Sequence, residues 1–374
     1  MQIKNFKFDD KRRDWCIEET GFDNFNLLVG ISGVGKTRIL KAIQNVCQVA
    51  TGSYQPFGGM EWKIGFVHAN QEYEWELKNS LVPNFSEVDE SEPAAIIYEK
   101  IFKKAGDQKM VLLERSETTN QLGGKEIPKL KKTESAISLL SEEISIAPIY
   151  EGFKSVIFNE TLPTIPVVTS RIDPESIHRK SLMPLDVFKQ KSIRLPTVIK
   201  AYRLAKFYPQ EFNQLKVDFT NIFTSVEDLK VIVARNKEIE YEFSFNIKES
   251  GEWISQARMS SGMFRILVQL IDISLAPPGS VILIDEFENS LGINCMPEMT
   301  DFVMSKAPLM QFILSSHHPY IISKIPQKTW KLVSRKGGHV IVKNATDIPQ
   351  LQTASRLNKF IQLANLPEYE EGIL

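Results

Sequence analysis

Cysteines are scarce in this sequence, and neither sign of charge is in excess. Only three of the 374 residues are cysteines, and their spacing indicates neither a disulfide framework nor a zinc site. With 45 basic and 46 acidic residues, the formal net charge is −1. Net charge therefore does not draw the chain to nucleic acid or to anionic lipid, and any nucleic-acid contact must come from a local patch.

Long apolar runs are absent as well. No run approaches the roughly 18 residues that a membrane-spanning helix needs, and residues 1–14 lack the apolar core of a signal peptide. We therefore expect a cytoplasmic protein without a membrane partner. Internal repeats, low-complexity tracts and heptad runs are missing too. The hydrophobic fraction of 43% indicates an ordinary globular chain with a sizeable core.

The stretch NLLVGISGVGKTRILKAIQNV, residues 26–46, carries the strongest chemical signature. It fits the pattern G-x-x-x-x-G-K-[ST], in which successive backbone N–H groups curl around a phosphate. An apolar run over 25–29 predicts a buried strand before the loop, and apolar residues at helical spacing predict a helix after it. The residues expected to hold the nucleotide are Gly30, Ser32, Gly33, Val34, Gly35, Lys36 and Thr37.

Two residues of this loop have distinct expected roles. The Lys36 ammonium is expected to reach the β and γ phosphates, and the Thr37 hydroxyl to ligate Mg²⁺. The start of the following helix adds unpaired N–H groups and a partial positive charge. The sequence therefore predicts ATP and Mg²⁺ as ligands.

Alternating apolar and polar residues predict antiparallel strands on both sides of the loop. Residues 2–19 and 60–77 are each expected to form a hairpin. Their turns are expected at the charged 9–14 and at the polar 70–72. No second metal ligand has a suitable spacing to His68, which we interpret as a structural residue.

The rest of the chain shows a mixture of patterns. The further elements predicted from periodicity and turn residues are a loop over 79–96, a strand at 111–114 with a turn at Gly123–Gly124, a helix over 135–158 interrupted near Pro148, an irregular connection over 159–194 with Pro163, Pro166, Pro174 and Pro184, a helix over 197–223 and a hairpin over 241–255.

Two groups of basic residues each allow two interpretations. Lys11, Arg12 and Arg13 fit solvated turn charges or a nucleotide contact. The lysines between 125 and 132 fit a solvated surface or a contact with a nucleic-acid backbone. In the tail, residues 353–374 carry an amphipathic stripe that fits docking of a partner or packing on the chain itself. Its apolar members are Leu357, Phe360, Ile361 and Leu363.

A second helical segment begins with MSSGMFR, residues 259–265. Its pattern S-x-G-x-x-R resembles the signature motif of ABC-type ATPases. The resemblance implies that Ser260 and Gly262, with Arg265 beside them, bind the γ-phosphate of ATP held by the opposite subunit. A helix start suits an anion for the same reason as before. An ATP-dependent homodimer or higher oligomer is therefore expected.

The run VILIDE, residues 281–286, is apolar and ends in two carboxylates. This is the pattern of a buried parallel strand whose carboxyl end faces a site. It resembles the Walker B strand, which implies that Asp285 holds Mg²⁺ and that Glu286 polarises the attacking water. The following ENSL, residues 288–291, continues a form found in SMC-like and OLD-like ATPases.

A further apolar strand is expected over 312–316 and is followed by His317 and His318. The segment resembles the switch-histidine segment of the same ATPases. The resemblance implies that His317 contacts the γ-phosphate, whereas His318 is interpreted as incidental.

Together these motifs predict an α/β P-loop fold of the ABC ATPase type, with a mixed central sheet, an antiparallel β subdomain and a helical insert that serves as a lid. Four segments are expected: an N-terminal ATPase lobe at 1–80, the insert at 81–225, a C-terminal ATPase lobe at 226–345 and a tail helix at 346–374.

The long interval between Lys36 and Gly262 exceeds that of transporter ATPases, and no coiled coil fills it as in SMC proteins. The chain resembles the compact ATPases of the OLD, RecF and Septu or PARIS anti-phage type. Ser32 stands where these families usually have Asn, and Gly292-Ile293 stands where they usually have His-Pro.

The resemblance implies a slowly hydrolysing ATPase that acts as sensor or scaffold for an effector protein encoded nearby, such as a nuclease. A RecF-like DNA-repair ATPase is the alternative. A fused nuclease is not expected, because the sequence contains no D-x-D and leaves little room after His318.

Overall fold

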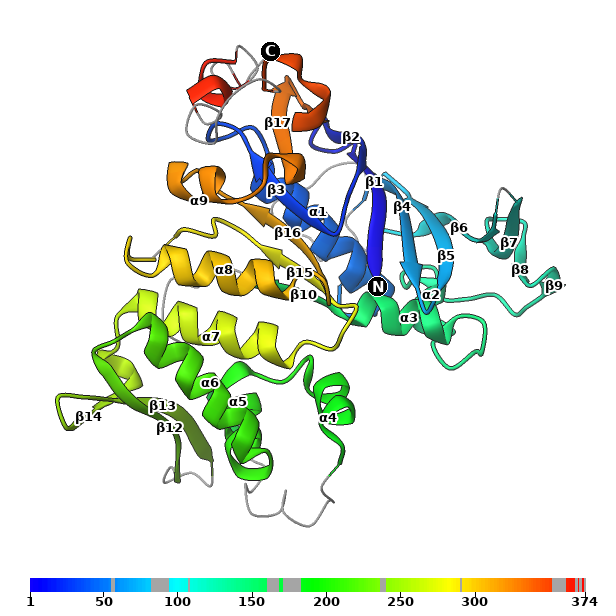
Figure 1. Ribbon diagram of the computed structural model, residues 1–374. Helices are drawn as coiled ribbons and strands as arrows, with labels where there is room; N and C mark the ends of the chain where they lie inside the picture. Colours follow the sequence, from blue (N-terminus) through cyan, green and yellow to red (C-terminus); the bar gives the residue numbers. More distant parts are fainter. Residues whose placement is uncertain are drawn as a thin grey trace, which may run out of the picture. The chain divides into compact units, whose positions relative to one another are not determined.

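The computed structural model in Figure 1 describes residues 1–54, 58–81, 94–106, 108–159, 168–170, 183–235, 240–289, 291–351, 361–366, 369 and 372. It comprises two compact units, which are Met1–Phe158 with Gly279–Phe287 and Ala307–Leu374 (unit 1), and Asn159–Pro278 with Glu288–Lys306 (unit 2). Both units are discontinuous in sequence, and their limits differ from the four segments expected above.

Unit 1 is built on one mixed sheet. In the described part of the chain it has 14 strands, ordered β10-β15-β16-β3-β17-β18-β2-β1-β4-β5-β6-β7-β8-β9. Their bounds are β1 Gln2–Asp10, β2 Trp15–Gly21, β3 Phe25–Val29, β4 Met60–His68, β5 Gln71–Asn79, β6 Ile96–Ala105, β7 Gln108–Arg115, β8 Asn120–Leu122, β9 Lys125–Glu126, β10 Val156–Asn159, β15 Val281–Ile284, β16 Gln311–Ser315, β17 Trp330–Lys336 and β18 His339–Asn344.

Four neighbouring strands, β15, β16, β3 and β17, form the parallel centre of this sheet. All residues of β3, β15 and β16 are buried, which explains why their sequences are mostly apolar rather than alternating; the polar exceptions are Asn26, Gln311 and Ser315. The strands predicted at 25–29, 281–286 and 312–316 are confirmed here. Parallel strands bring their carboxyl ends to one edge of the sheet, so the motifs that follow these strands meet at that edge.

The strands β2, β1 and β4 to β9 form an antiparallel arm that continues the same sheet. Both predicted hairpins are confirmed, but the second turns at Ala69 and Asn70, whose φ angles of 49° and 59° are left-handed. The turn predicted at Gly123–Gly124 joins β8 and β9. β6 was not expected from the sequence.

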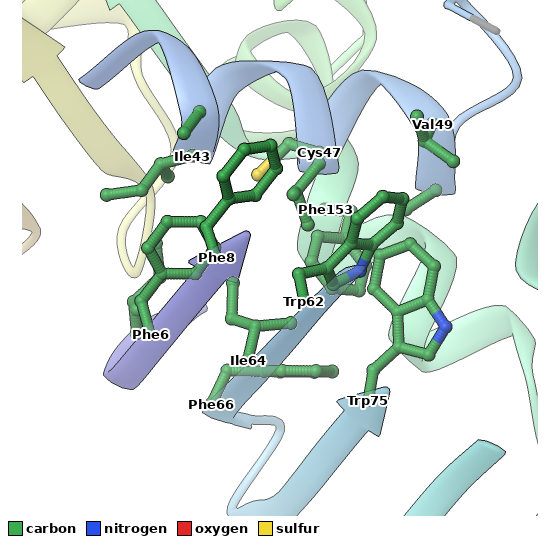
Figure 2. Close-up of a cluster of buried hydrophobic side chains, with 14 of the residues drawn as sticks. Phe6, Phe8, Ile43, Cys47, Val49, Trp62, Ile64, Phe66, Trp75 and Phe153 are labelled. Atoms are coloured by element: carbon green, nitrogen blue, oxygen red, sulfur yellow. The ribbon is translucent and has the colours of Figure 1, made fainter. Parts of the chain in front are cut away.

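A cluster of aromatic side chains fixes α1 on the arm (Figure 2). Trp62 and Trp75, from neighbouring strands, meet edge to face with ring centroids 5.3 Å apart. The ring centroid of Phe153 in α3 lies 4.8 Å from that of Phe66 and 5.2 Å from that of Trp75. Buried aromatic and aliphatic side chains contribute about 1.5–3 kcal/mol each, so this cluster anchors the helix that follows the glycine loop.

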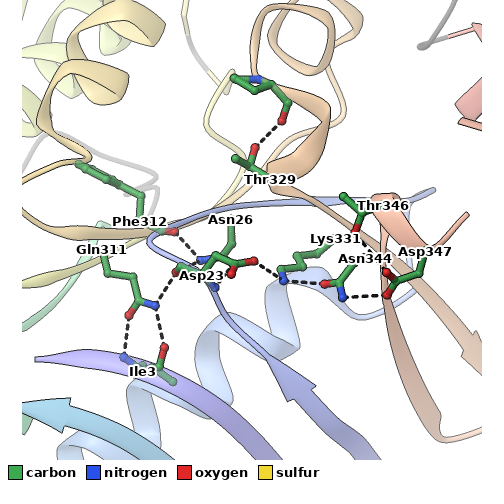
Figure 3. A network of polar contacts seen from close by, with 11 residues as sticks. Ile3, Asp23, Asn26, Gln311, Phe312, Thr329, Lys331, Asn344, Thr346 and Asp347 are labelled. Carbon is green, nitrogen blue, oxygen red and sulfur yellow. Dashed lines mark hydrogen bonds and ion pairs between the residues drawn. The ribbon is translucent and has the colours of Figure 1, made fainter. Parts of the chain in front are cut away.

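Polar side chains tie the parallel centre to the rest of unit 1 (Figure 3). The buried Gln311 accepts a hydrogen bond from Ile3 N and donates one to Ile3 O, both at 2.8 Å, so it links β16 to β1. Its amide also donates to Asp23 O at 2.7 Å. Asp23 in turn pairs with Lys331 of β17 at 2.9 Å. These contacts brace strands that are not neighbours in the sheet.

The expectation of an interrupted helix over 135–158 is partly wrong. The helices α2 and α3 occupy Ala136–Leu139 and Ala147–Lys154, and Pro148 lies in the first turn of α3, where its missing N–H costs nothing. Residues 156–159 are strand β10 instead. Their β-branched and aromatic side chains favour pairing at the edge of the sheet.

Unit 2 contains a small sheet and helices. Its strands are β11 Val168–Ser170, β12 Val226–Arg235, β13 Tyr241–Glu249 and β14 Glu252–Ser255, and the hairpin predicted over 241–255 is confirmed by β13 and β14. Its helices are α4 Leu185–Ser192, α5 Thr197–Phe207, α6 Pro209–Ile222, α7 Ser261–Leu275 and α8 Met296–Lys306, with the 3-10 helix η2 Gln256–Arg258.

The helix predicted over 197–223 is confirmed, with a break between α5 and α6 before Pro209. α4 is a helix where an irregular connection was expected, and Pro163, Pro166 and Pro174 of that connection lie outside the described residues. Inside unit 2, Lys200 of α5 pairs with Asp272 of α7 at 2.8 Å, and both side chains are buried. This pair locks α7 against α5.

The remaining elements of unit 1 are α1 Lys36–Ala50, α9 Pro319–Lys324 and the 3-10 helices η3 Gln327–Thr329, η4 Ala345–Asp347 and η5 Pro349–Leu351. Residues 361–364 of the expected tail helix are helical. Leu357 and Phe360 of its apolar stripe lie outside the described residues, whereas Leu363 is buried and Ile361 is exposed.

Candidate nucleotide-binding site

The glycine loop between β3 and α1 has the backbone that the motif requires. Gly30, Gly33 and Gly35 have φ angles of 151°, 86° and 110°, which side-chain-bearing residues rarely adopt. A Cβ atom on Gly30 would lie 2.4 Å from the carbonyl oxygen of Val333 in β17. The loop is therefore held tightly against the parallel centre. Val34 is fully buried beneath it, while Ser32 and Gly33 are exposed.

The Lys36 side chain turns back into the loop. Its exposed fraction is 5%, and its Nζ donates to Gly30 O at 2.6 Å and to Ile31 O at 2.8 Å. His317 Nδ1, which follows β16, lies 3.5 Å from the same Nζ. The strand, loop, helix order thus fixes a cation against the backbone carbonyls of the loop.

The hydroxyl of Thr37 meets the acidic motif. Its Oγ1 donates to Asp285 Oδ1 at 3.1 Å, although the two residues are 248 positions apart in sequence. Asp285 directly follows β15, so the parallel pairing of β15, β16 and β3 accounts for this meeting. Ser315, the last residue of β16, donates to the same Oδ1 at 2.6 Å.

Glu286 has an unusual backbone conformation. Its φ is 45°, in the left-handed region, which costs of order 1–3 kcal/mol for a residue other than glycine and occurs mainly at functional sites. Its N–H donates to Ser315 Oγ at 2.8 Å, and the next N–H, of Phe287, donates to Ser315 O at 2.9 Å. The Glu286 side chain is exposed.

The two histidines play different structural parts. His317 is partly buried beside Lys36, as described above. His318 caps α9, because its Nδ1 accepts from Tyr320 N at 3.2 Å. The ring of His318 is thus occupied at the start of α9, which gives it a role that the sequence did not indicate.

The residues of the expected signature motif lie in unit 2. Ser260 is the N-cap of α7, and its Oγ accepts from Met263 N at 3.1 Å. Gly262 is in the first turn of that helix, and Arg265 Nη1 donates to Asn289 O at 2.6 Å. Ser290 of the ENSL segment lies outside the described residues. Ile293, which follows that segment, is 80% exposed.

Basic residues near the first turn are paired with carboxylates. Lys11 lies 3.1 Å from Glu61, and Arg13 lies 3.7 Å from Asp10. In the lysine-rich stretch between 125 and 132, Lys131 pairs with Glu134. These pairs suit solvated turn charges, and contacts of the two groups with nucleotide or nucleic acid stay untested.

The oxygen donors suit Mg²⁺. Among the described residues, no group of three or more His, Cys, Asp and Glu side chains has a metal-binding arrangement. Mg²⁺ in nucleotide sites uses one or two protein oxygens and completes its shell with phosphates and water, so a dense cluster is not required. The Thr37 hydroxyl and the Asp285 carboxylate, 3.1 Å apart, provide such a pair.

A protein family described as "AAA domain, putative AbiEii toxin, Type IV TA system" matches residues 25–323, which include the glycine loop, the acidic motif and both histidines. The chain belongs to this family. Its description names an AAA domain, which agrees with the P-loop ATPase that the glycine loop and the acidic motif predicted. No curated protein matches the chain.

Solved structures similar to this ATPase include three SMC heads. The SmcHead bound to the C-winged helix domain of ScpA shares 14% identity with a TM-score of 0.47, over 92% of this chain and 97% of that one. The SMC head domain from Thermotoga maritima shares 13% identity with a TM-score of 0.40, over 92% of this chain and 99% of that one. The third is the Smc head domain with an extended coiled coil, bound to the C-terminal domain of ScpA derived from Pyrococcus furiosus. It shares 12% identity with a TM-score of 0.45, over 91% of this chain and 96% of that one.

Within the described part of the chain, no helix has both the length and the apolar character needed to cross a membrane.

Proposed function

We propose that this chain binds ATP with Mg²⁺ at the glycine loop of unit 1 and hydrolyses it slowly. One observation carries the proposal: Thr37 and Asp285, from distant parts of the sequence, meet at 3.1 Å beside the Lys36 and His317 pair. A loop cation, a hydroxyl and a carboxylate at one sheet edge are the groups that P-loop ATPases use to hold the phosphates and Mg²⁺.

Each residue has a definite task in this proposal. The loop N–H groups and Lys36 bind and orient the β and γ phosphates, and His317 contacts the terminal phosphate. Thr37 and Asp285 hold Mg²⁺, which neutralises charge on the phosphates when it is bound. Glu286 accepts a hydrogen bond from the attacking water and holds it in line with the phosphorus. Catalysis is thus mainly positioning and electrostatic stabilisation.

We further propose an ATP-dependent dimer in which Ser260, Gly262 and Arg265 of one subunit contact ATP on the other. The N-cap position of Ser260 supports this role, because a helix start favours an anion. The active dimer would serve as sensor or scaffold for an effector protein, such as a nuclease, in anti-phage defence. The family description names a putative toxin of a type IV toxin–antitoxin system and no protein partner, so the effector is proposed from the motifs alone.

Two features support an effector supplied by another protein. The candidate catalytic groups of this chain all belong to one phosphoryl-transfer site, and no group of three or more His, Cys, Asp and Glu side chains with a metal-binding arrangement occurs among the described residues. The expected docking surfaces are the 81–225 segment and the tail. Deleting 353–374 should preserve ATP hydrolysis but abolish co-purification with the effector. Loss of both together would instead indicate a structural tail.

The direct test is ATP hydrolysis by the purified chain, with Lys36→Ala as the inactive variant and Lys41→Ala as matched control. Lys41 lies on the same helix and is exposed. We expect hydrolysis by the wild type and the control only. Equal rates in all three proteins would reject the site. Salt-dependent DNA binding, measured in parallel, would favour the DNA-repair alternative.

A further inference from the structure

Ser315 joins the two acidic residues of the site. It is the last residue of β16, and its side chain is buried. The hydroxyl donates to Asp285 Oδ1 at 2.6 Å and accepts from Glu286 N at 2.8 Å. Its carbonyl accepts from Phe287 N at 2.9 Å. One residue therefore bonds to three consecutive residues of the neighbouring segment.

The direction of these bonds follows from the chemistry of a hydroxyl. Serine has one proton to donate and lone pairs that accept. Since the backbone N–H of Glu286 can only donate, it takes a lone pair of Ser315 Oγ, and the single proton remains for Asp285. A short bond to an ionised acceptor is of the stronger kind. The hydroxyl thus couples the orientation of the Asp285 carboxylate to the backbone of Glu286.

The hydrogen bonds of Ser315 also hold the left-handed backbone conformation of Glu286. A φ of 45° is not a conformation that glutamate adopts without restraint. The two N–H bonds to Ser315 hold Glu286 and Phe287 in this turn. Without the hydroxyl, the turn would lose one of these bonds, and Glu286 would relax toward an ordinary backbone conformation.

We propose that Ser315 is a positioning residue for ATP hydrolysis: it orients Asp285 toward Mg²⁺ and holds Glu286 in the turn that directs its carboxylate to the attacking water. This proposal rests on the function proposed above. It assigns Ser315 no contact with ATP, so its removal should slow the chemical step without weakening ATP binding in the absence of metal.

Ser280 provides a matched control. It is a buried serine directly before β15, and its hydroxyl has no hydrogen-bond partner within the described residues. Ser280→Ala and Ser315→Ala therefore remove the same atom from buried positions at the two ends of neighbouring strands. A difference between them reports the hydrogen bonds and not the burial of a hydroxyl.

The experiment compares wild type, Ser315→Ala, Ser315→Thr and Ser280→Ala by two readouts. For Ser315→Ala we expect kcat to fall about tenfold or more, the size expected for a lost bond to a charged group. In mant-ADP titrations, the gain in affinity on replacing EDTA with Mg²⁺ should shrink in Ser315→Ala. Affinity in EDTA should be unchanged. Ser315→Thr keeps the hydroxyl and should restore both readouts, and Ser280→Ala should match the wild type.

The outcomes separate this proposal from the function on which it rests. If the wild type hydrolyses ATP and Ser315→Ala behaves as Ser280→Ala does, the positioning role is wrong. If Ser315→Thr is as impaired as Ser315→Ala, the effect is one of packing and the role is equally wrong. A wild type that hydrolyses no ATP contradicts the proposed function. In that case the Mg²⁺-dependent gain in mant-ADP affinity still tests the positioning role of Ser315. Should Ser315→Ala not fold, Ser315→Cys, with its weak donor in a similar volume, takes its place under the same criteria.

Discussion

The parallel centre and the antiparallel arm of unit 1 belong to one sheet, yet they use carboxylates in opposite ways. In the arm, Glu74 is 2% exposed and lies within 2.8–3.7 Å of the Nζ atoms of Lys63, Lys104 and Lys109. In the centre, Asp285 accepts hydrogen bonds from the hydroxyls of Thr37 and Ser315.

The partners determine what each carboxylate can do. Burial acts to raise the pKa of Glu74, but the hydrogen bond from Lys109 and the charges of the three lysines outweigh it, so the pKa is lowered. Fixed cations thus neutralise Glu74. The hydroxyls of Thr37 and Ser315 instead fix the direction of the Asp285 carboxylate, an oxygen ligand of the kind that Mg²⁺ prefers. The comparison predicts large functional effects in the centre and purely structural effects in the arm.

The largest effect is expected from Lys36→Ala. The loop loses a cation aimed at the phosphates, so affinity for mant-ATP should fall about a hundredfold or more, as expected for two charge-assisted hydrogen bonds. Fluorescence titration measures it, with Lys41→Ala as control. Wild-type affinity in Lys36→Ala would remove the basis for assigning nucleotide binding to the centre.

Next in size is Glu286→Gln. The amide cannot polarise water as a carboxylate does, so the hydrolysis rate should fall by about 10² to 10⁴. ATP binding should persist because Lys36 and Thr37 are untouched, and the ATP-bound dimer should accumulate in size-exclusion chromatography. A rate equal to that of the wild type would place catalysis elsewhere.

A third test asks whether the ATP site of one subunit needs the signature motif of the other subunit. Lys36→Ala and Ser260→Arg should each be inactive, but mixed subunits should form heterodimers with one intact composite site. By random pairing in a two-fold dimer, activity should return to about a quarter of wild type. A mixture that stays inactive, although subunit exchange is demonstrated by labelled chains, would show that the signature motif does not act across subunits.

The smallest effect concerns the arm. Glu74→Gln should leave mant-ATP affinity unchanged and lower the free energy of unfolding by about 2 kcal/mol, because three lysines lose a charged hydrogen-bond partner. Urea denaturation measures this difference. A loss of ATP binding at full stability would contradict the separation of arm and centre.

The pH dependence of the same variant provides an internal check. The folded-state pKa of Glu74 is lowered, so its stabilisation is fully present above the ordinary glutamate value of 4.5 and is lost as pH falls through the lowered pKa. The stability difference between wild type and Glu74→Gln should therefore shrink below pH 4.5. A difference that grows with acidity would mean that the lysines do not control this carboxylate.

The sequence predicted those parts of the fold that local patterns encode. Continuous apolar runs identified the strands of the parallel centre, and the glycine pattern identified the loop. β6 was missed because its residues IIYEKIFKKA do not alternate strictly, and a bulge between Ile101 and Phe102 shifts the register. The two units were missed because each combines segments that are far apart in sequence.

The candidate site could be anticipated by residue type but not by geometry. The motifs placed Lys36, Thr37 and Asp285 at one site; the structure joins Thr37 to Asp285 and puts Lys36 beside His317. Neither the left-handed φ of Glu286 nor the bonds of Ser315 has a sequence signature, since both depend on the pairing of β15 with β16. A polar residue at the end of an otherwise apolar strand was the only available signal for Ser315.

The strand order of the parallel centre also has a consequence for biosynthesis. β3 is synthesised long before both of its neighbours, β16 and β17. Until they are made, the apolar β3 has two unpaired edges, which are templates for association with other chains. The same topology that assembles the site from distant segments therefore delays the pairing of β3.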